Sequence, residues 1–251
     1  MFQIVSDLHI ETMNGTPSSK DFITPSAPVL IMAGDIGRIR KYNQLKLFLE
    51  DVCKNFDIVL YVLGNHEYYK VKDMSDKTMD ELYQDMLRIE AGIDNLYLLN
   101  RSSVIIGDVC IAGVTLWSQA LVKVPPFIVR IKGMGTRKYN TLHQNDVRYI
   151  KKMVKYCSKN KLKLLVVSHH CPSYTPIDRW GKRHKKDRFK SLYSTNLDYL
   201  LDSGKIHTWV CGHLHINFDY LTKGGTRLVG NQKGKPKDRT TGFSMSKVIC
   251  V

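Results

Sequence analysis

Hydrophobic residues along the chain gather in short runs that end abruptly in polar residues. Five such runs cover residues 2–6, 28–33, 58–63, 162–168 and 208–211. Each run is short and rich in β-branched residues, and turn residues bound it, as expected for buried strands. Apolar residues at helical spacing predict helices at about 42–55, 75–91, 145–157 and 195–201. The alternation of strand and helix predicts that the strands at 29–33 and 58–63 are parallel.

The middle and the end of the chain follow a different pattern. Runs at 96–99, 103–106 and 109–114 predict an antiparallel stretch, with Gly107-Asp108 as a hairpin turn. Residues 118–140 and 173–192 predict two long loops. The last apolar runs, after residue 217, predict closing antiparallel strands. This order of elements fits two αββα halves or a sandwich of two mixed sheets flanked by helices.

Composition limits the class of protein. A chain of 251 residues that is 43% hydrophobic can bury a sizeable core, most simply as a single domain over residues 1–251. No apolar run approaches the roughly 18 residues of a membrane span, and the N-terminus lacks the features of a signal peptide. The six cysteines include no CxxC pair. These features predict a protein of the reducing cytoplasm that does not enter membranes.

Charge divides the chain into two unequal halves. Residues 1–125 carry 12 basic and 16 acidic residues, whereas residues 126–251 carry 26 basic and 7 acidic residues. Basic residues are dense in the insertion near 179–190, where we single out Arg179, Lys182, Arg183, Lys185 and Lys186 as candidate substrate contacts. Such an asymmetry favours a polyanionic substrate. The alternative for the insertion is a solvated loop.

Side chains able to bind a metal follow each of the five strand-like runs. In chain order they are Asp7 and His9, Asp35, Asn65 and His66, His169 and His170, and His213 and His215. Ligands bind at the carboxyl ends of strands in α/β sheets, and a set without thiolates favours ions such as Mn²⁺, Fe or Zn²⁺. Two ions with a bridging carboxylate would use all candidates. They would suit in-line displacement at phosphorus, because they bind phosphate oxygens and generate hydroxide at neutral pH.

At this point the motifs resemble a known family. The resemblance is to the calcineurin-like metallophosphoesterase superfamily, over residues 1–216, and rests on Asp7-x-His9, Gly34-Asp35, Gly64-Asn65-His66-Glu67, His169-His170 and Gly212-His213-x-His215. Further motifs are similar to a branch of small soluble phosphoesterases, namely Thr115-Leu116-Trp117, His169-His170-x-Pro172 and Asn231-x-x-Gly234. The resemblance implies a four-layer αββα sandwich of two mixed sheets flanked by helices, with a dinuclear site at the sheet edges.

The resemblance also implies a role for each candidate. The first ion would be held by Asp7, His9 and His215, the second by Asn65, His213 and one histidine of the 169/170 pair, and Asp35 would bridge them. We favour His170 as the ligand because it stands two residues before Pro172, which leaves His169 as a neighbouring or substrate-facing group. His66 would donate a proton to the leaving oxygen. The cofactors would be two divalent ions, Mn²⁺ first and Fe or Zn²⁺ as alternatives.

One motif departs from the family pattern. Many members have Gly-Asp-x-x-Asp, and protein phosphatases extend it with Arg-Gly, where this chain has Gly34-Asp35-Ile36-Gly37-Arg38. The bridging Asp35 is present, but the missing second Asp argues against a protein phosphatase.

The function expected from the sequence is therefore a metal-dependent phosphoric ester hydrolase. The first expectation is a phosphodiesterase of nucleotides or nucleic acids that works by attack of metal-bound hydroxide with His66 as general acid. A phosphomonoesterase or protein phosphatase is the alternative. A non-catalytic nucleic-acid-binding module on the same fold is a further alternative, although every ligand position is filled.

Overall fold

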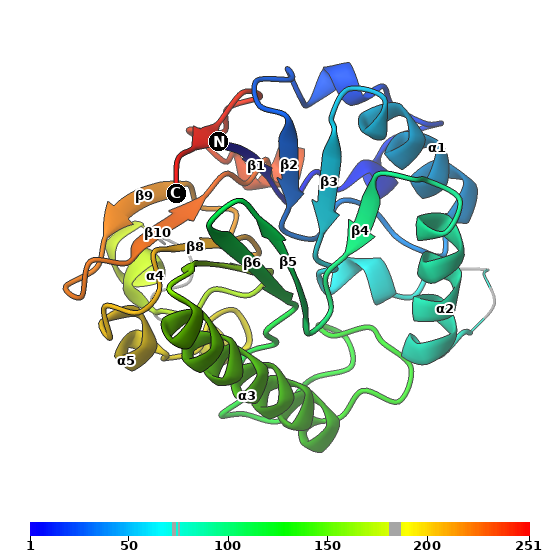
Figure 1. Ribbon diagram of the computed structural model, residues 1–251. Helices are drawn as coiled ribbons and strands as arrows, with labels where there is room; N and C mark the ends of the chain where they lie inside the picture. Colours follow the sequence, from blue (N-terminus) through cyan, green and yellow to red (C-terminus); the bar gives the residue numbers. More distant parts are fainter. Residues whose placement is uncertain (72–73, 75, 181–186) are drawn as a thin grey trace.

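Two β-sheets form the centre of the molecule, and helices cover their outer faces (Figure 1). The computed structural model describes residues 1–71, 74, 76–180 and 187–251. The strands of the first sheet, in spatial order, are β11 (Val248–Ile249), β1 (Phe2–Val5), β2 (Val29–Met32), β3 (Ile58–Tyr61) and β4 (Leu96–Leu98). Strands β1 to β4 are parallel, and β11 is antiparallel to β1.

The second sheet is also mixed. In spatial order it contains β5 (Ser102–Ile106), β6 (Val109–Val114), β7 (Lys163–Ser168), β8 (Thr208–Cys211), β10 (Arg227–Gly230) and β9 (Phe218–Leu221). The four inner strands are parallel, whereas the edge strands β5 and β9 are antiparallel to their neighbours. The expected sandwich of two mixed sheets flanked by helices is confirmed.

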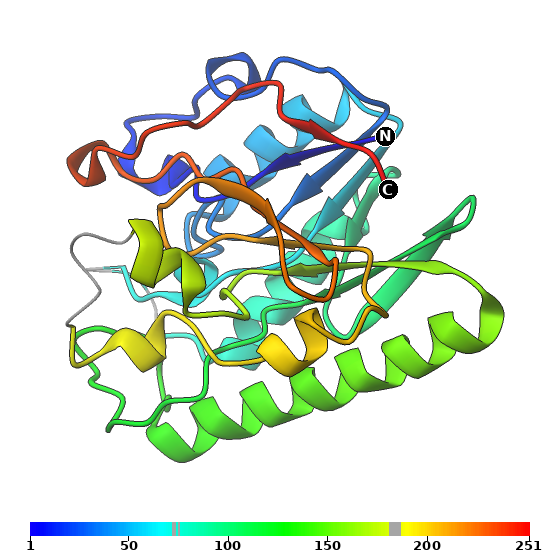
Figure 2. The same ribbon diagram turned by 90° about the vertical axis from the view of Figure 1, so that its left-hand side faces the viewer.

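The helices form the outer layers. They are α1 (Tyr42–Cys53), α2 (Met79–Glu90), α3 (Thr136–Asn160), α4 (Thr175–Trp180) and α5 (Asp198–Leu201). Short 3-10 turns lie at Ile10–Thr12, Ser19–Asp21, His66–Tyr68, Lys190–Leu192 and Pro236–Asp238. Figure 2 shows α3 along the outer face of the second sheet, where it contacts β6 and β7. No helix in the described ranges is long and apolar enough to cross a membrane.

Alternating side chains place the core on both faces of each sheet. In β2, Val29 and Ile31 pack between the sheets, whereas Leu30 and Met32 pack on the helix side. All four side chains are buried. In a strand with only one covered face, alternate side chains would be exposed to solvent. This double burial explains why the strands are continuous apolar runs, and why polar residues begin only where the strands end.

Two expectations about the middle of the chain differ from the structure. β4 pairs parallel to β3 in the first sheet, and only β5 and β6 form the antiparallel hairpin. Helix α3 begins at Thr136, although residues up to 140 were expected in a loop. Its first turns bury Tyr139 and His143, and the His143 ring contacts the backbone carbonyls of Leu116 and Trp117 at 3.0 and 2.7 Å. A polar side chain can be buried when it is hydrogen-bonded in this way. The buried face of a helix that contains such residues does not show up as a periodic pattern of apolar residues.

Candidate metal centre

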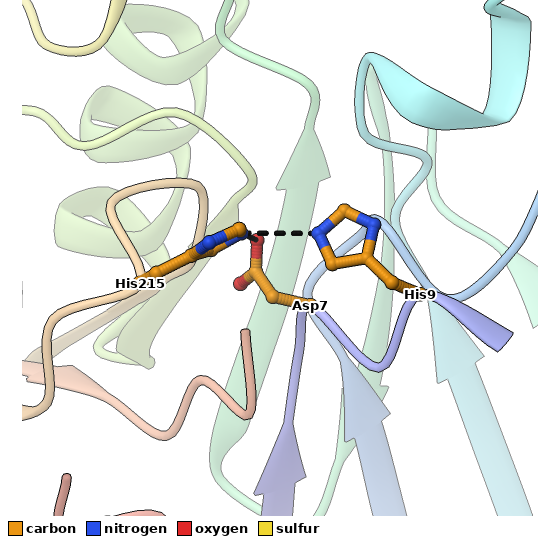
Figure 3. Close-up of side chains that lie close together, drawn as sticks. All are labelled: Asp7, His9 and His215. Carbon is orange, nitrogen blue, oxygen red and sulfur yellow. Dashed lines mark hydrogen bonds and ion pairs between the residues drawn. The ribbon is translucent and has the colours of Figure 1, made fainter. Parts of the chain in front are cut away.

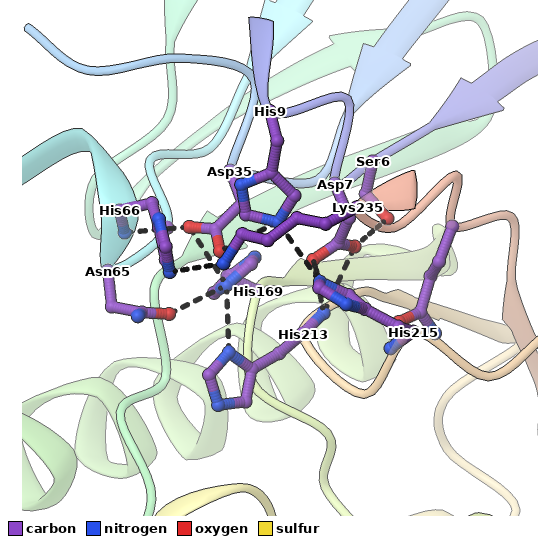
Figure 4. A network of polar contacts seen from close by, with 12 residues as sticks. Ser6, Asp7, His9, Asp35, Asn65, His66, His169, His213, His215 and Lys235 are labelled. Atoms are coloured by element: carbon purple, nitrogen blue, oxygen red, sulfur yellow. Dashed lines mark hydrogen bonds and ion pairs between the residues drawn. The ribbon is translucent and has the colours of Figure 1, made fainter. Parts of the chain in front are cut away.

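The candidate ligands meet at one edge of the sandwich, as Figure 4 shows. Asp7 and His9 follow β1, Asp35 follows β2, and Asn65 and His66 follow β3. The second sheet contributes the rest, with His169 after β7 and with His213 and His215 after β8. Both sheets therefore send their polar loops to a single place, where parallel strands end.

The backbone of the ligand loops is left-handed at five non-glycine residues. The φ angles lie between 51° and 73° at Asp7, His9, Asp35, His213 and His215. Each such residue costs about 1–3 kcal/mol and persists only where the surroundings enforce it. Hydrogen bonds provide that enforcement here, because the amides of Asp7 and His9 donate to the carbonyls of Gly34 and Asp35 at 2.9 and 3.0 Å. Strain of this kind concentrates at functional sites.

The first ligand group consists of Asp7, His9 and His215 (Figure 3). The Nε2 atoms of His9 and His215 face each other at 3.0 Å, and Nε2 of His215 lies 3.3 Å from Oδ1 of Asp7. The other ring nitrogens contact carboxylates: Nδ1 of His9 lies 3.1 Å from Oε1 of Glu11, and Nδ1 of His215 lies 2.6 Å from Oδ2 of Asp238. Both rings are thus oriented with Nε2 inward.

The second ligand group centres on His169. Its Nε2 lies 3.0 Å from Oδ1 of Asn65, 3.2 Å from Oδ1 of Asp35 and 3.1 Å from Nδ1 of His213. Its other nitrogen, Nδ1, contacts the backbone carbonyl of Ala33 at 2.9 Å. Four donor atoms therefore converge; Asp35, Asn65 and His169 are buried, whereas His213 is partly exposed.

Asp35 lies between the two groups. Its Oδ1 faces His169, whereas its Oδ2 lies 3.8 Å from Nε2 of His9. Burial raises the pKa of the Asp35 carboxyl, but the charges of His169 and His66 outweigh burial and hold that pKa well below its usual value. The carboxylate is therefore ionised, with one oxygen directed at each group.

The spacing of the donor atoms fits divalent metal ions. Bonds of about 2.0–2.2 Å from an ion to nitrogen and oxygen place neighbouring donors roughly 3–3.5 Å apart. Neighbouring donors in both groups lie 3.0–3.3 Å apart. Imidazole nitrogens that face each other at 3.0 Å across a buried space need a shared cation, or a shared proton, to be stable. The residues present therefore suit two ions, with Asp35 between them.

The structure brings His169 rather than His170 into the second group, which differs from our expectation. Nε2 of His170 lies 3.3 Å from the hydroxyl of Tyr139, and Nδ1 lies 3.4 Å from the carbonyl of Thr115. The His170 ring packs against that of His213, with 4.1 Å between the ring centroids. Both of its nitrogens thus already have protein partners, so His170 contributes no free donor atom and instead packs beside the second group.

His66 stands beside both groups with its ring held between two charged residues. Its Nδ1 lies 3.2 Å from Oε1 of Glu11, and its Nε2 lies 3.1 Å from Nζ of Lys235 (Figure 4). Burial lowers the pKa of His66 to about 4, while Asp35 and Glu11 act in the opposite direction. Because Glu11 also contacts His9, one carboxylate orients a candidate ligand and the candidate acid together.

Glu67, which follows His66 in the sequence, ties two ligand loops together. Its buried carboxylate accepts hydrogen bonds from the backbone amides of Asp35, Ile36 and Gly64 at 2.8–3.1 Å, and from the Tyr61 hydroxyl at 2.6 Å. Gly64 is required by the close approach of these loops, since a Cβ atom there would meet Oδ1 of Asp35 at 2.4 Å. The motif therefore contains a structural residue next to two candidate functional ones.

Three further residues lie at the site that the sequence did not indicate, namely Glu11, Lys235 and Asp238. None lies at the end of an apolar run, which was the signal used for the other candidates. Glu11 is two residues beyond His9, so its proximity to that motif was the available signal. Lys235 and Asp238 follow the Asn231-x-x-Gly234 motif, to which the sequence assigns no role.

A pocket of about 750 Å³ opens above the ligand groups. Its floor includes Asp35, Asn65, His66, His213 and His215, and its walls include Phe127, Trp180, Tyr193, Arg130, Lys235 and Arg239. Of the candidate substrate contacts, Arg179 is not among the described residues that line the pocket. Its guanidinium lies over the rings of Trp180 and Tyr220, at 5.9 and 5.6 Å. Lys182, Arg183, Lys185 and Lys186 lie outside the described residues.

Comparisons with known proteins agree with this architecture. The model of the family described as calcineurin-like phosphoesterase matches residues 2–217. A protein of Acanthamoeba polyphaga mimivirus, named Uncharacterized protein L509, is 24% identical over 263 residues, which cover 95% of this chain and 92% of that protein.

Two solved structures have the same fold. Phosphopantetheinyl Hydrolase (PptH) from Mycobacterium tuberculosis aligns with a TM-score of 0.75 at 17% identity, over 97% of this chain and 93% of that one. A dimetal phosphatase from Danio rerio aligns with a TM-score of 0.52 at 13% identity, over 91% of this chain and 86% of that one.

Proposed function

The chain belongs to the calcineurin-like phosphoesterase family, and from that premise we propose that it is a dinuclear phosphodiesterase that acts on nucleotides or nucleic acids. Membership makes it a metal-dependent phosphoester hydrolase. The observation that supports the choice of substrate is the pocket, which combines the ligand groups on its floor with exposed aromatic rings and cations on its walls.

The proposed ligands of the first ion are Asp7, His9 and His215, and those of the second are Asn65, His169 and His213, with Asp35 shared by both. The support is the convergence of their donor atoms at 3.0–3.3 Å and the position of Asp35 between the groups. When bound, two such ions neutralise the charge of a phosphate ester and lower the pKa of water, so that attack on phosphorus is possible at neutral pH.

His66 is the proposed proton donor to the leaving oxygen. Its ring does not belong to either proposed ligand set, and it lines the pocket. Glu11 accepts from Nδ1, so Nε2 is the atom directed toward a substrate. An anionic phosphate beside Nε2 favours the protonated ring, which opposes the effect of burial. The proton that the leaving oxygen needs is therefore available once the ester has bound.

The walls of the pocket suit a substrate with a planar organic group. Phe127 and Trp180 line it with 70% and 43% of their surfaces exposed, although large aromatic side chains are usually buried. Exposed rings beside a cationic groove are the features on which nucleic acid bases stack. Arg130 and Arg239 supply the charge in the same pocket. A volume of about 750 Å³ is in the range that holds a drug-sized ligand.

The outer surface supports the same class of substrate. Helix α3 has Arg148, Lys151, Lys152, Lys155 and Lys159 exposed, while its one acidic residue, Asp146, is buried and paired with Arg101 at 2.7 Å. All exposed charged residues of α3 are therefore basic. Such a face raises the local concentration of polyanions.

A hydrolysis panel tests the proposal. Protein loaded with Mn²⁺ would be assayed on aryl phosphate monoesters and diesters, cyclic nucleotides, and short RNA and DNA. We expect diesters to be cleaved faster than the matching monoesters, and nucleotide diesters faster than small aryl diesters. Hydrolysis confined to monoesters would assign a phosphomonoesterase instead. Binding of oligonucleotides without any turnover would indicate a non-catalytic module.

A further inference from the structure

A segment beyond the family match completes the pocket. The match ends at residue 217, yet residues 232–238 lie against the ligand loops. The amides of Lys233 and Gly234 donate to the carbonyls of Ser6 and Asp7 at 3.1 and 3.0 Å. The side chain of Gln232 accepts from the amide of His215 at 2.6 Å. The segment is therefore attached to both halves of the first ligand group.

The backbone at residue 235 is fixed by the same contacts. Gly234 has a φ of +70°, and a Cβ atom there would meet Oγ1 of Thr240 at 2.2 Å, so only glycine fits. The amide of Lys235 donates to Oδ2 of Asp238 at 2.9 Å, and the same oxygen contacts Nδ1 of His215 at 2.6 Å. This anchoring directs the side chain of Lys235 across the ligand groups toward His66 (Figure 4).

The ammonium group of Lys235 lies between the His66 ring and the pocket. Its Nζ lies 3.1 Å from Nε2 of His66 and lines the pocket. Within the described part of the chain, no carboxylate lies within ion-pair distance of it, in contrast to Lys77, Lys190 and Lys247. The residue is only partly exposed. The carboxylates of Asp35, Glu11 and Asp238 act on this half-buried cation only from beyond ion-pair distance, and an anionic ligand in the pocket would make the direct charged contact that they do not.

We propose that Lys235 is a phosphate-binding residue, which contacts an oxygen of the substrate phosphate group on the side where His66 stands. This inference rests on the proposed function and deepens it. Nζ of Lys235 and Nε2 of His66 are close enough to contact one phosphate group together. The cation then neutralises charge on the phosphate group while His66 stands ready at the leaving oxygen. The segment after residue 217 thus adds a substrate contact to a centre whose proposed ligands and proton donor lie within the family match.

The test uses inorganic phosphate, which requires no turnover. Its affinity for the Mn²⁺-loaded protein would be measured by calorimetry for wild type, Lys235→Met and Lys235→Arg. The matched control is Lys233→Met, which removes the same charge from the same segment. The Lys233 ammonium points elsewhere, over the ring of Phe22 at 5.1 Å. Metal content would be determined by mass spectrometry for each variant.

We expect Lys235→Met to bind phosphate about 10- to 100-fold more weakly, the scale of a lost charge-assisted hydrogen bond. The phosphate affinity of Lys235→Arg should stay within a few fold of wild type, and that of Lys233→Met should be unchanged. All variants should retain two ions.

Equal phosphate affinities for Lys235→Met and Lys233→Met would overturn the proposal. Loss of metal from Lys235→Met, or failure of Lys235→Arg to retain phosphate, would overturn it as well. Absence of phosphate binding in wild type would overturn both this proposal and the phosphoesterase centre. An unexpected preference in the hydrolysis panel alone would change only the proposed substrate.

Discussion

The two ligand groups differ in what lies behind their histidine rings. In the first group, the outer nitrogens of His9 and His215 contact the carboxylates of Glu11 and Asp238. In the second group, the outer nitrogen of His169 contacts a backbone carbonyl. Nε2 of His213 has no hydrogen-bond partner among the described residues. A carboxylate partner makes an imidazole a stronger ligand and fixes its tautomer. We therefore expect the first group to bind its ion more tightly than the second.

The largest effect is expected at Asp35, whose two carboxylate oxygens face the two groups. Asp35→Asn should lower metal content at both sites, because it removes the charge that they share. Activity should fall well beyond the roughly 10–100-fold typical of losing a ligand's outer partner. Metal content, measured alongside kcat, checks this. Circular dichroism should be unchanged, since the core between the sheets is separate from the site. Two tightly bound ions and full activity would refute the shared role.

His66 separates turnover from metal binding, because it is in neither proposed ligand set. His66→Ala should keep both ions while kcat falls by roughly 10²–10⁴-fold, the usual range for a general acid. The loss should be smaller for esters with a nitrophenolate leaving group, which needs less protonation. The measurement is kcat for a series of leaving groups. An equal loss across that series would exclude His66 as the acid.

Asp238 offers the sharpest test of the difference between the groups. Asp238→Asn should lower the affinity for the first ion by about 10-fold and at most 100-fold, because it removes only the carboxylate partner of His215. The second ion should bind as in wild type. Competition with a graded chelator measures the two affinities. The control is Asp219→Asn, a carboxylate paired with Arg227 and Lys247. If Asp219→Asn lowers the affinity for the first ion equally, the loss comes from the change in net charge and not from the contact with His215.

The sequence identified the parts of the candidate site that follow strand ends. Asp7, Asp35, Asn65 and His213 were identifiable because doubly buried strands leave apolar runs, and polar residues begin where burial stops. The parallel order of β2 and β3 followed from the helix between them. These features are local, so they are visible in short stretches of sequence.

Which of His169 and His170 faces the other candidate ligands depends on contacts with distant parts of the chain. Both follow β7, and the outcome depends on which ring finds a partner elsewhere. His170 packs toward Tyr139, whose helix was expected to be a loop at that point. Lys235 and Asp238 reach the centre through a turn that depends on Gly234 and on contacts with Ser6 and Asp7. Such long-range contacts leave no periodic signal in the sequence.

The distance in sequence between the members of the first ligand group affects when this group can form during synthesis of the chain. His9 and His215, whose Nε2 atoms face each other, are 206 residues apart in the chain. A contact between such distant residues forms late in folding, because closing a long loop and pairing non-local strands are slow. A ribosome-bound chain that ends before residue 215 cannot assemble this group. An ion held by Asp7, His9 and His215 together would therefore be acquired only after residue 215 has been made, and it would reflect the metal supply met at that stage.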